Sequence, residues 1–369
     1  MSRTKKHRPL AMELAKLLTF WIPVSTWRKR ARKALVVGNP YRKVHRAQDR
    51  LLDRKLLASE RLVIFLVPER TTMSGGVHSI FSIARHSRSF QQLHGAEVIV
   101  MTYPNRERQT YVHQPNFENA ETVFRFEQLL RFTSLKSLIL HIPEYLSADF
   151  VSQLTVDHLS YLRRLPDFQI NILNQNIKLM PEAHQLNELR ALAQHLTQTT
   201  AHHRYATQAV ADQFNMPTLL LPAYTDLSMY RPTEFEDKRD LVIYSPDAHP
   251  AKADILAAIG KALPRYELRE IRGIPFSEYM TLATQARFAI TFGEGFDGYL
   301  AQPIRQGGVS FAVYNEDFFP SEEYLAYPNI FSSYEEMQNN IVAVMKDLLT
   351  NPDEYRDLSA ALKRASDNL

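Results

Sequence analysis

The chain has no cysteine among its 369 residues. Without thiols it cannot form a disulfide framework, a zinc–thiolate site or a cysteine nucleophile. Several catalytic motifs are missing as well: the sequence has no Asp-x-Asp pair, no His-Glu-x-x-His, no Gly-x-Ser-x-Gly and no Walker loop. These absences argue against zinc hydrolases, serine hydrolases and P-loop nucleotidases. We therefore expect neither a metal ion nor a cofactor, and a cysteine-free chain suits the reducing cytoplasm.

Glycine is scarce too, with 11 residues in the whole chain against an average of about 7%. Five of them fall within residues 293–308, directly after the apolar run 287–292, which predicts a buried strand. Glycine at the end of a strand lets backbone N–H groups approach a ligand. A helix that begins after the turn would direct its N-terminal dipole at an anion such as a diphosphate. With the carboxylate of Glu294 in its middle, this segment predicts a ligand-binding turn.

The net charge of +4 conceals an asymmetry along the chain. Residues 1–61 contain 17 Lys and Arg and four acidic residues, which gives a net charge of +13. The rest of the chain contains 27 basic and 36 acidic residues, which gives a net charge of −9. A nucleic-acid enzyme would more often spread its basic residues over the folded surface. We therefore expect no nucleic-acid partner.

The basic N-terminal segment also contains a short apolar run at residues 17–24. This run is too short to span a bilayer, and no cleavage site of a signal peptide follows it. A basic segment that carries Trp, Phe and Leu suits the interface of an anionic membrane, which residues 1–55 would contact. Alternatively, the segment is a helix that packs on the rest of the protein and keeps its charges in solvent. The sequence leaves both interpretations open.

The remaining chain alternates short apolar segments with longer helical patterns, which is typical of parallel sheets with crossover helices. The predicted strands are 62–67, 97–101, 136–141, 169–173 and 218–221, then 241–245, 266–271, 287–292 and 309–314. The predicted helices are 77–93, 119–132, 146–163 and 184–194, then 251–263, 276–286, 334–350 and 352–366. A polar stretch at 230–239 reads as a linker between the two series.

This pattern predicts an α/β protein with two Rossmann-like, doubly wound domains and a ligand cleft between them. The length of the chain also favours two domains over one. We expect a basic helical extension at 1–58, an N-terminal domain at 59–228 and a C-terminal domain at 229–350. The last segment, 351–369, is expected to be a helix that packs back on the N-terminal domain.

Three candidate site features stand at predicted strand ends. Gly75 and Gly76 lie where a loop enters a helix and suit close approach to a sugar or phosphate, although a plain tight turn would use the same residues and the spacing is not that of a dinucleotide fingerprint. His141 and Glu144 follow the third strand and would face the cleft, where they would meet a substrate hydroxyl. A lone histidine at a strand end is nevertheless more often structural. Lys252, at the start of a helix, would add a point charge to a diphosphate site, or remain a solvated lysine.

Taken together, these residues resemble the GT-B glycosyltransferases, most closely family 4, the retaining branch. The segment 217–232 is similar to that family's entry into its second domain, and the Lys252 region to its donor-phosphate lysine. Residues 294–302 overlay the family's signature of two glutamates eight positions apart, with Gln302 in place of the second. The arginine that usually precedes the lysine has no counterpart. The pattern is also similar to transferases of bacterial surface-polysaccharide synthesis.

The resemblance implies a donor nucleotide sugar and a glycan or lipid-linked glycan as acceptor. It implies that Glu294 contacts the transferred sugar and that Gln302 reaches the ribose. The other donor-side residues would be Gly75, Gly76, Lys252, Gly293, Gly295, Phe296, Asp297 and Tyr299. On the acceptor side, His141 would be catalytic, with Glu144 and His78 nearby. Two alternatives remain: a sugar-nucleotide 2-epimerase of the same fold, and a non-catalytic binding subunit.

Overall fold

The computed structural model describes residues 27–28, 40–72, 74–104, 109–116 and 121–367. The apolar run 17–24 and most of the basic segment expected at a membrane surface lie outside these described residues. Residues 40–58 are included and pack on the first domain, where Leu52 is buried in the core and Arg125 donates hydrogen bonds to Gln48 and Asp49. Among the helices of the described ranges, none has the length and apolar character needed to cross a membrane.

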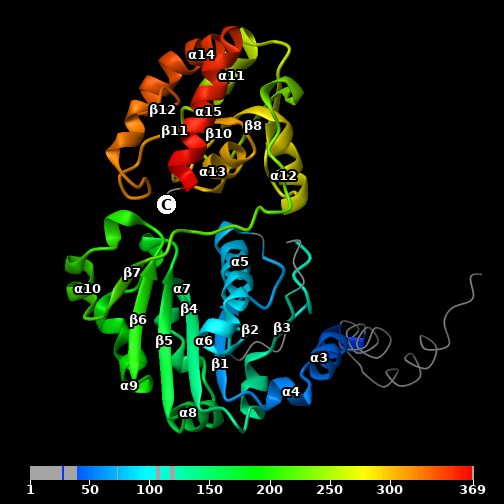
Figure 1. The fold of residues 1–369 in the computed structure, drawn as a ribbon, viewed down its shortest axis with the longest axis vertical. Helices are drawn as coiled ribbons and strands as arrows, with labels where there is room; N and C mark the ends of the chain where they lie inside the picture. The colour runs from blue at the N-terminus through cyan, green and yellow to red at the C-terminus, as the bar shows by residue number, and fades with distance from the viewer. Residues whose placement is uncertain (1–26, 29–39, 73, 105–108, 117–120, 368–369) are drawn as a thin grey trace, which may run out of the picture.

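Within the described residues, seven parallel strands form the first sheet, in the order β3-β2-β1-β4-β5-β6-β7 (Figure 1). Their bounds are β1 Arg61–Val67, β2 Glu97–Thr102, β3 Val123–Phe124, β4 Ser137–Pro143, β5 Asp167–Asn174, β6 His195–Thr200 and β7 Thr218–Leu220. Five more parallel strands form the second sheet, in the order β12-β11-β10-β8-β9. These are β8 Arg239–Tyr244, β9 Glu267–Glu270, β10 Ala286–Ile290, β11 Val309–Val313 and β12 Ile330–Phe331.

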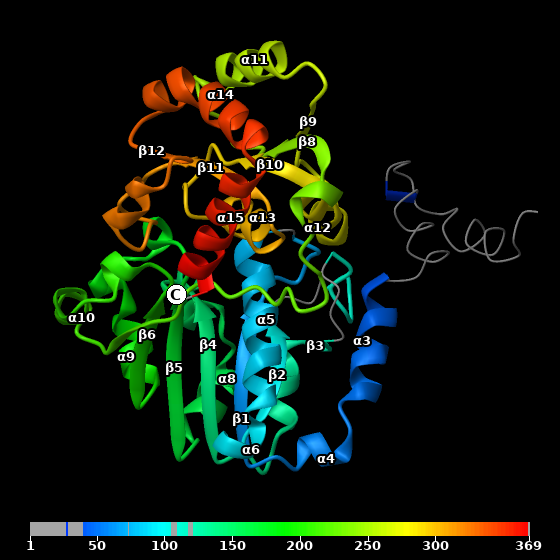
Figure 2. The same ribbon diagram turned by 45° about the horizontal axis from the view of Figure 1, so that its top comes forward.

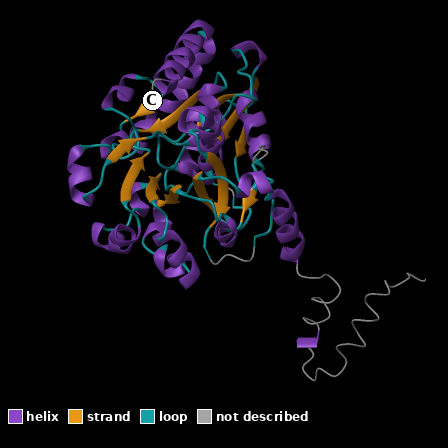
Figure 3. Cartoon of the chain, turned by 60° about the horizontal axis from the view of Figure 1, so that its bottom comes forward, coloured by secondary structure: helices purple, strands orange, loops and turns teal. Residues whose placement is uncertain are grey.

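Helices cover both faces of each sheet, as Figure 3 shows from below. In the first domain they are α3 Pro40–Leu51, α4 Arg54–Leu57, α5 Gly75–Ser89, α6 Gln91–His94, α7 Glu144–Ser147, α8 Val156–Arg163, α9 Asn187–Leu192 and α10 Gln208–Phe214. In the second they are α11 Lys252–Ala262, α12 Phe276–Gln285, α13 Gly298–Arg305, α14 Tyr334–Thr350 and α15 Pro352–Asp367. Short 3₁₀ helices include η1 Phe126–Arg131, η3 Ile177–Leu179 and η5 His203–Tyr205.

The central strand β1 explains why the strands read as continuous apolar runs. Val63, Phe65 and Val67 pack in one core cluster with residues of α5, while Ile64 and Leu66 pack in a second cluster on the opposite face. A parallel strand covered on both faces has no polar side to alternate with its apolar one. The domain is therefore doubly wound, and the second sheet is likewise enclosed by a core cluster on each face.

Each sheet has one point at which the strand order reverses: between β1 and β4 in the first domain, and between β8 and β10 in the second. Ligands of doubly wound sheets bind beyond the carboxyl ends of the strands at this point. The carboxyl ends of both sheets face the gap between the domains (Figures 1 and 2). The protein thus has the expected α/β architecture of GT-B type, with two Rossmann-like domains and a cleft between them.

Several elements of the structure differ from the expected ones, and the helix expected at 146–163 is interrupted between α7 and α8. The described part of the helix expected at 119–132 is instead β3 followed by η1. Phe126 and Leu129 of η1, and Phe132 directly after it, are fully buried at every third position, a spacing that suits a 3₁₀ helix. Strand β6 was not predicted because its sequence, His195–Thr200, is polar and only partly buried. The short edge strand β12 has too few residues for a periodic signal.

The C-terminal helix also differs from the expectation that it packs on the N-terminal domain. Tyr355, Leu358 and Leu362 of α15 are buried in the core of the second domain, and the Tyr355 hydroxyl donates to the carbonyl of Arg287 at 2.6 Å. Because these residues are three, four and seven positions apart, they lie on one apolar face of the helix. Its last turn reaches the cleft between the domains, whose lining includes Ser366 and Asp367.

Candidate functional site

A cleft of about 1500 Å³ separates the two domains. Its first-domain wall comes from the start of α5 and the loops after β4, β5 and β6, and its second-domain wall from the loops after β8, β9 and β10 and from α13. Both walls lie at the reversal points of the two sheets. The cleft is therefore where this topology places a ligand.

The glycine-rich turn after β10 lines the second-domain wall, but its glycines contact the protein itself. Gly295 has a φ of +90°, and a Cβ atom there would lie 2.7 Å from the Val313 carbonyl oxygen and from the Phe319 ring. A Cβ on Gly293 would lie 2.8 Å from a carboxylate oxygen of Asp247. The turn needs glycine at these positions to fit against its protein neighbours. The sequence analysis located the turn correctly, but it explained the glycines by close approach to a ligand rather than by this packing.

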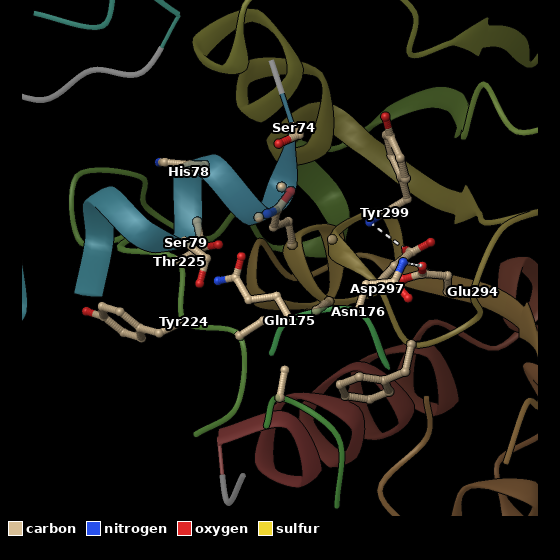
Figure 4. A pocket seen from close by; sticks show the side chains of 18 of the residues that line it. Ser74, His78, Ser79, Gln175, Asn176, Tyr224, Thr225, Glu294, Asp297 and Tyr299 are labelled. Carbon is tan, nitrogen blue, oxygen red and sulfur yellow. Dashed lines mark hydrogen bonds between the residues drawn. The ribbon is translucent and has the colours of Figure 1, made fainter. Parts of the chain in front are cut away.

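Glu294 joins the two domains from the middle of this turn. Its Oε1 accepts a hydrogen bond of 3.1 Å from the side-chain amide of Asn176, which follows β5 in the first domain (Figure 4). Burial raises the pKa of the Glu294 carboxyl, while the nearby ammonium of Lys178 opposes that rise. The Glu294 carboxylate is thus presented to the cleft, with its position fixed from both walls.

The N-terminus of α13 is closed by its own capping residue. One carboxylate oxygen of Asp297 accepts from the N–H groups of Tyr299 and Leu300, at 2.8 and 3.0 Å, and the other accepts from the Thr291 hydroxyl at 2.7 Å. The helix does begin after the turn, as expected. However, the capping carboxylate occupies the position at which the sequence predicted a diphosphate.

The buried carboxyl of Asp297 is expected to make the free energy of unfolding depend on pH. Burial raises its pKa from 3.8 to about 7. The folded state therefore binds more protons than the unfolded state between these two values, and the free energy of unfolding falls as the pH rises through the window. We expect Asp297→Asn, which keeps an N-cap oxygen, to remove this decrease and to be more stable than wild type above pH 7 by at least about 1 kcal/mol.

Urea unfolding of both proteins across the window measures this effect. Asp212→Asn, on α10, provides a control with the same change of side chain remote from the cleft. Parallel pH profiles for wild type and Asp297→Asn would contradict the assigned pKa of Asp297.

On the opposite wall, Gly75 and Gly76 begin α5 and line the cleft. Ser74 caps this helix by accepting from the Val77 N–H at 3.2 Å. A Cβ atom on Gly76 would lie 2.7 Å from Oε1 of Gln175, whereas one on Gly75 would meet nothing within 4 Å. Gly76 thus permits close packing against the loop after β5, and Gly75 leaves an open surface at the start of the helix.

Two predicted acceptor-side residues, Glu144 and His78, line the cleft. Glu144 is buried, its Oε2 accepts from the Gln175 N–H at 3.2 Å, and burial raises its pKa. His78 packs against the Phe276 ring at 4.0 Å between ring centroids, and burial lowers its pKa to about 4 despite the opposing charge of Asp226. At neutral pH the imidazole of His78 is therefore uncharged.

His141 does not line the cleft. It is paired within the sheet with Phe65 of β1 and Asn171 of β5, stacks on the Phe65 ring at 4.3 Å and contacts Asn171 Oδ1 through Nδ1 at 3.2 Å. Burial lowers its pKa to about 4, more than the hydrogen bond to Asn171 raises it. These contacts favour the structural interpretation of this histidine over a catalytic one.

Lys252 also stays outside the cleft lining. Its ammonium donates to the carbonyls of Ser245 and Asp247 at 2.7 and 3.0 Å and pairs with Glu270 at 3.1 Å. It holds the loop after β8 in place. The remaining predicted donor-side residues, Phe296, Tyr299 and Gln302, do line the cleft.

Sequence reasoning did not identify the first-domain residues that contact the second domain across the cleft. Asn176 and Lys178 follow β5, and Arg204 and Tyr205 follow β6. Tyr205 donates to Asp317 at 2.6 Å, and Arg204 pairs with Glu316. The available signal was position alone, because residues after a parallel strand lie at the ligand-binding edge. The described part of the chain contains no group of three His, Cys, Asp or Glu that could hold a metal ion.

The sequence matches no protein-family model and no curated protein. Among solved structures it is similar to a glycosyltransferase from Rickettsia africae, with 8% identity, a TM-score of 0.46 and coverage of 84% of this chain and 94% of that one. It is also similar to a UDP-GlcNAc 2-epimerase from Neisseria meningitidis, with 10% identity, a TM-score of 0.44 and coverage of 83% of this chain and 97% of that one. A third similar structure is an ADP-heptose lipopolysaccharide heptosyltransferase from E. coli, with 14% identity, a TM-score of 0.36 and coverage of 79% of this chain and 99% of that one. At such identities the similarity identifies no substrate or reaction.

Proposed function

We propose that this protein is a glycosyltransferase that moves a sugar from a nucleotide-diphosphate sugar to a glycan acceptor. One observation carries the proposal: a carboxylate, Glu294, lies at the reversal point of the second sheet and is held by Asn176 across an interdomain cleft. The cleft volume of about 1500 Å³ exceeds the roughly 300–1000 Å³ of a pocket for one small molecule. The space therefore suits two substrates bound together.

In this proposal the donor binds along the second domain, between the turn at Gly293 and Gly295 and the side chains of Tyr299 and Gln302. The Glu294 carboxylate accepts hydrogen bonds from hydroxyls of the transferred sugar. Its negative charge also stabilises the positive charge that develops on that sugar as the bond to the diphosphate breaks. The acceptor binds along the first domain near Glu144. The main contributions to rate are positioning and electrostatic stabilisation.

Retention of the anomeric configuration and a role in bacterial surface-polysaccharide synthesis belong to the same proposal. Their support is the resemblance of residues 294–302 to the two-glutamate signature. Association of residues 1–55 with an anionic membrane would bring a lipid-linked acceptor close to the cleft. We further propose that catalysis requires no metal ion.

The direct test is incubation of the purified protein with a panel of nucleotide-diphosphate sugars, with and without glycan acceptors and a chelator. We expect release of nucleoside diphosphate and a glycosylated product only when an acceptor is present, at a rate that the chelator leaves largely intact. Proton NMR of the product reports its anomeric configuration. Failure of every donor to bind would contradict the proposal, and binding without turnover would identify a non-catalytic subunit.

A sugar-nucleotide 2-epimerase is the second candidate, because the cleft holds several carboxyls suited to acid–base work. Burial raises the pKa of Glu144, Glu294 and Asp297, and raised values are typical of groups that transfer protons near neutral pH. The two candidates differ in one assay. An epimerase converts the donor alone into a new sugar nucleotide, whereas a transferase needs an acceptor.

A further inference from the structure

We propose that Lys178, from the first domain, is the cation that binds the diphosphate of the donor. The inference rests on the proposed function and assigns to Lys178 the role that was expected of Lys252. It follows from the distribution of charge around the cleft. The second-domain wall carries the carboxylates, and Lys178 reaches that wall from the opposite domain.

The wall formed by the glycine-rich turn is acidic. Asp247 and Asp297 meet at Gly293, where a Cβ atom would lie 2.8 Å from an oxygen of the first and 3.3 Å from an oxygen of the second. Glu294 adds a third carboxyl. Burial chiefly raises the pKa of Glu294 and of Asp297, and the charge of Asp247 adds to both shifts. A diphosphate carries at least two negative charges, so it needs a cation to bind beside these groups.

The cationic side chains of the second domain near the cleft are already paired. Lys252 contacts Glu270 at 3.1 Å, and Arg272 contacts the same carboxylate at 2.8 Å. Arg305 pairs with Asp367 at 3.1 Å. Each would have to give up an existing partner before it could bind a phosphate.

Lys178 differs from these three residues. It lines the cleft, is exposed, and among the described residues has no carboxylate within ion-pair distance. Its ammonium lies 5.0 Å from the centre of the Phe318 ring, which belongs to the second domain. Its backbone N–H donates to Asn176 Oδ1 at 3.0 Å, so the residue that holds Glu294 also fixes the start of the loop that carries Lys178.

These contacts give Lys178 a role in the transfer step. As the bond from the anomeric carbon to the diphosphate oxygen breaks, its electron pair stays on that oxygen, where negative charge increases. The acceptor hydroxyl oxygen forms the new bond to the anomeric carbon, and its proton passes to the departing diphosphate. Lys178 stabilises the charge on the leaving oxygens, while Glu294 stabilises the sugar. The two residues form an oppositely charged pair across the cleft.

The test compares Lys178→Met with wild type by calorimetric titration of nucleoside diphosphates and of the matching nucleosides, at low and high salt. We expect Lys178→Met to bind the diphosphate about tenfold more weakly, with nucleoside affinity unchanged and a reduced dependence on salt. Lys178→Arg should retain most of the diphosphate affinity. Lys261→Met, an exposed residue at the end of α11, makes the same change in net charge away from the cleft and should match wild type.

Each alternative outcome has a distinct meaning. If wild type binds no nucleoside diphosphate, the proposed function fails and this assignment fails with it. If wild type binds and Lys178→Met binds equally well, the assignment alone is wrong. An equal loss of affinity for nucleoside and diphosphate would show that Lys178 only supports the fold of its loop, and would also overturn the assignment.

Discussion

Replacing Glu294 by alanine is expected to lower sugar transfer by about 100-fold or more, while the protein remains folded and still binds nucleoside diphosphate. The carboxylate faces the cleft from a turn that other residues hold in place, with Phe292 N–H bonded to the Ser245 hydroxyl at 2.9 Å. Its removal therefore takes away the charge that we propose acts on the sugar, without removing a support of the turn. The loss should appear in kcat rather than in affinity for the diphosphate.

Two further variants separate the charge of Glu294 from its hydrogen bond. Glu294→Gln keeps an oxygen that can accept from Asn176 but removes the negative charge, and should be nearly as inactive as alanine. Glu354→Ala, an exposed glutamate on α15, removes a carboxylate remote from the cleft and should transfer sugar at the wild-type rate. Steady-state rates of sugar transfer and calorimetric titration of nucleoside diphosphate, measured for each variant, separate an effect on the transfer step from an effect on donor binding. Wild-type turnover in Glu294→Ala would remove this residue from the site.

Replacing Gly295 by alanine should destabilise the second domain by about 2 kcal/mol or more. At a φ of +90° a side chain is strained, and its Cβ atom would overlap the Val313 carbonyl oxygen and the Phe319 ring, each at 2.7 Å. A backbone carbonyl within a strand cannot move aside as a flexible side chain can. The turn that carries Glu294 would have to shift, so we expect lower activity as well as lower stability.

The stability of Gly75→Ala provides the matched comparison, because the same change is made at a glycine of the opposite wall. Nothing lies within 4 Å of a Cβ atom at Gly75, and we expect a change within about 0.5 kcal/mol. Urea unfolding monitored by circular dichroism measures both variants. Equal stability of Gly295→Ala and wild type would mean that the turn relaxes without cost, contrary to its packing.

Much of the fold followed from the sequence because parallel strands covered on both faces leave continuous apolar runs. β1, β2 and β11 were predicted to within one residue at each end for this reason. β6 was missed because Thr197, Gln198 and Thr199 give it no such run, although it pairs on both sides within the sheet. The segment before β4 was misread because apolar residues three positions apart are compatible with either kind of helix.

The candidate site was predictable in its position but not in its contacts. Glycine scarcity located the turn around Glu294, and strand ends located Gly75, Gly76 and Glu144. His141 and Lys252 were misplaced because sequence position does not show whether a polar side chain already has a partner. Asn176 was missed because sequence position also does not show which distant residue a polar side chain will contact. It lies 118 positions before Glu294, and only the folded chain brings the two together.

The contacts of Arg204 and Tyr205 with Glu316 and Asp317 bear on how substrates enter the cleft and products leave it. They join the same two domains as the Glu294–Asn176 hydrogen bond, so any separation of the domains would break them together. The Arg204–Glu316 pair is half-exposed, and exposed ion pairs contribute only about 0–1 kcal/mol each. Separation of the domains at this pair is therefore expected to cost little, and less still when dissolved salt screens the two charges. Ionic strength should then act on the rates of substrate entry and product release as well as on binding.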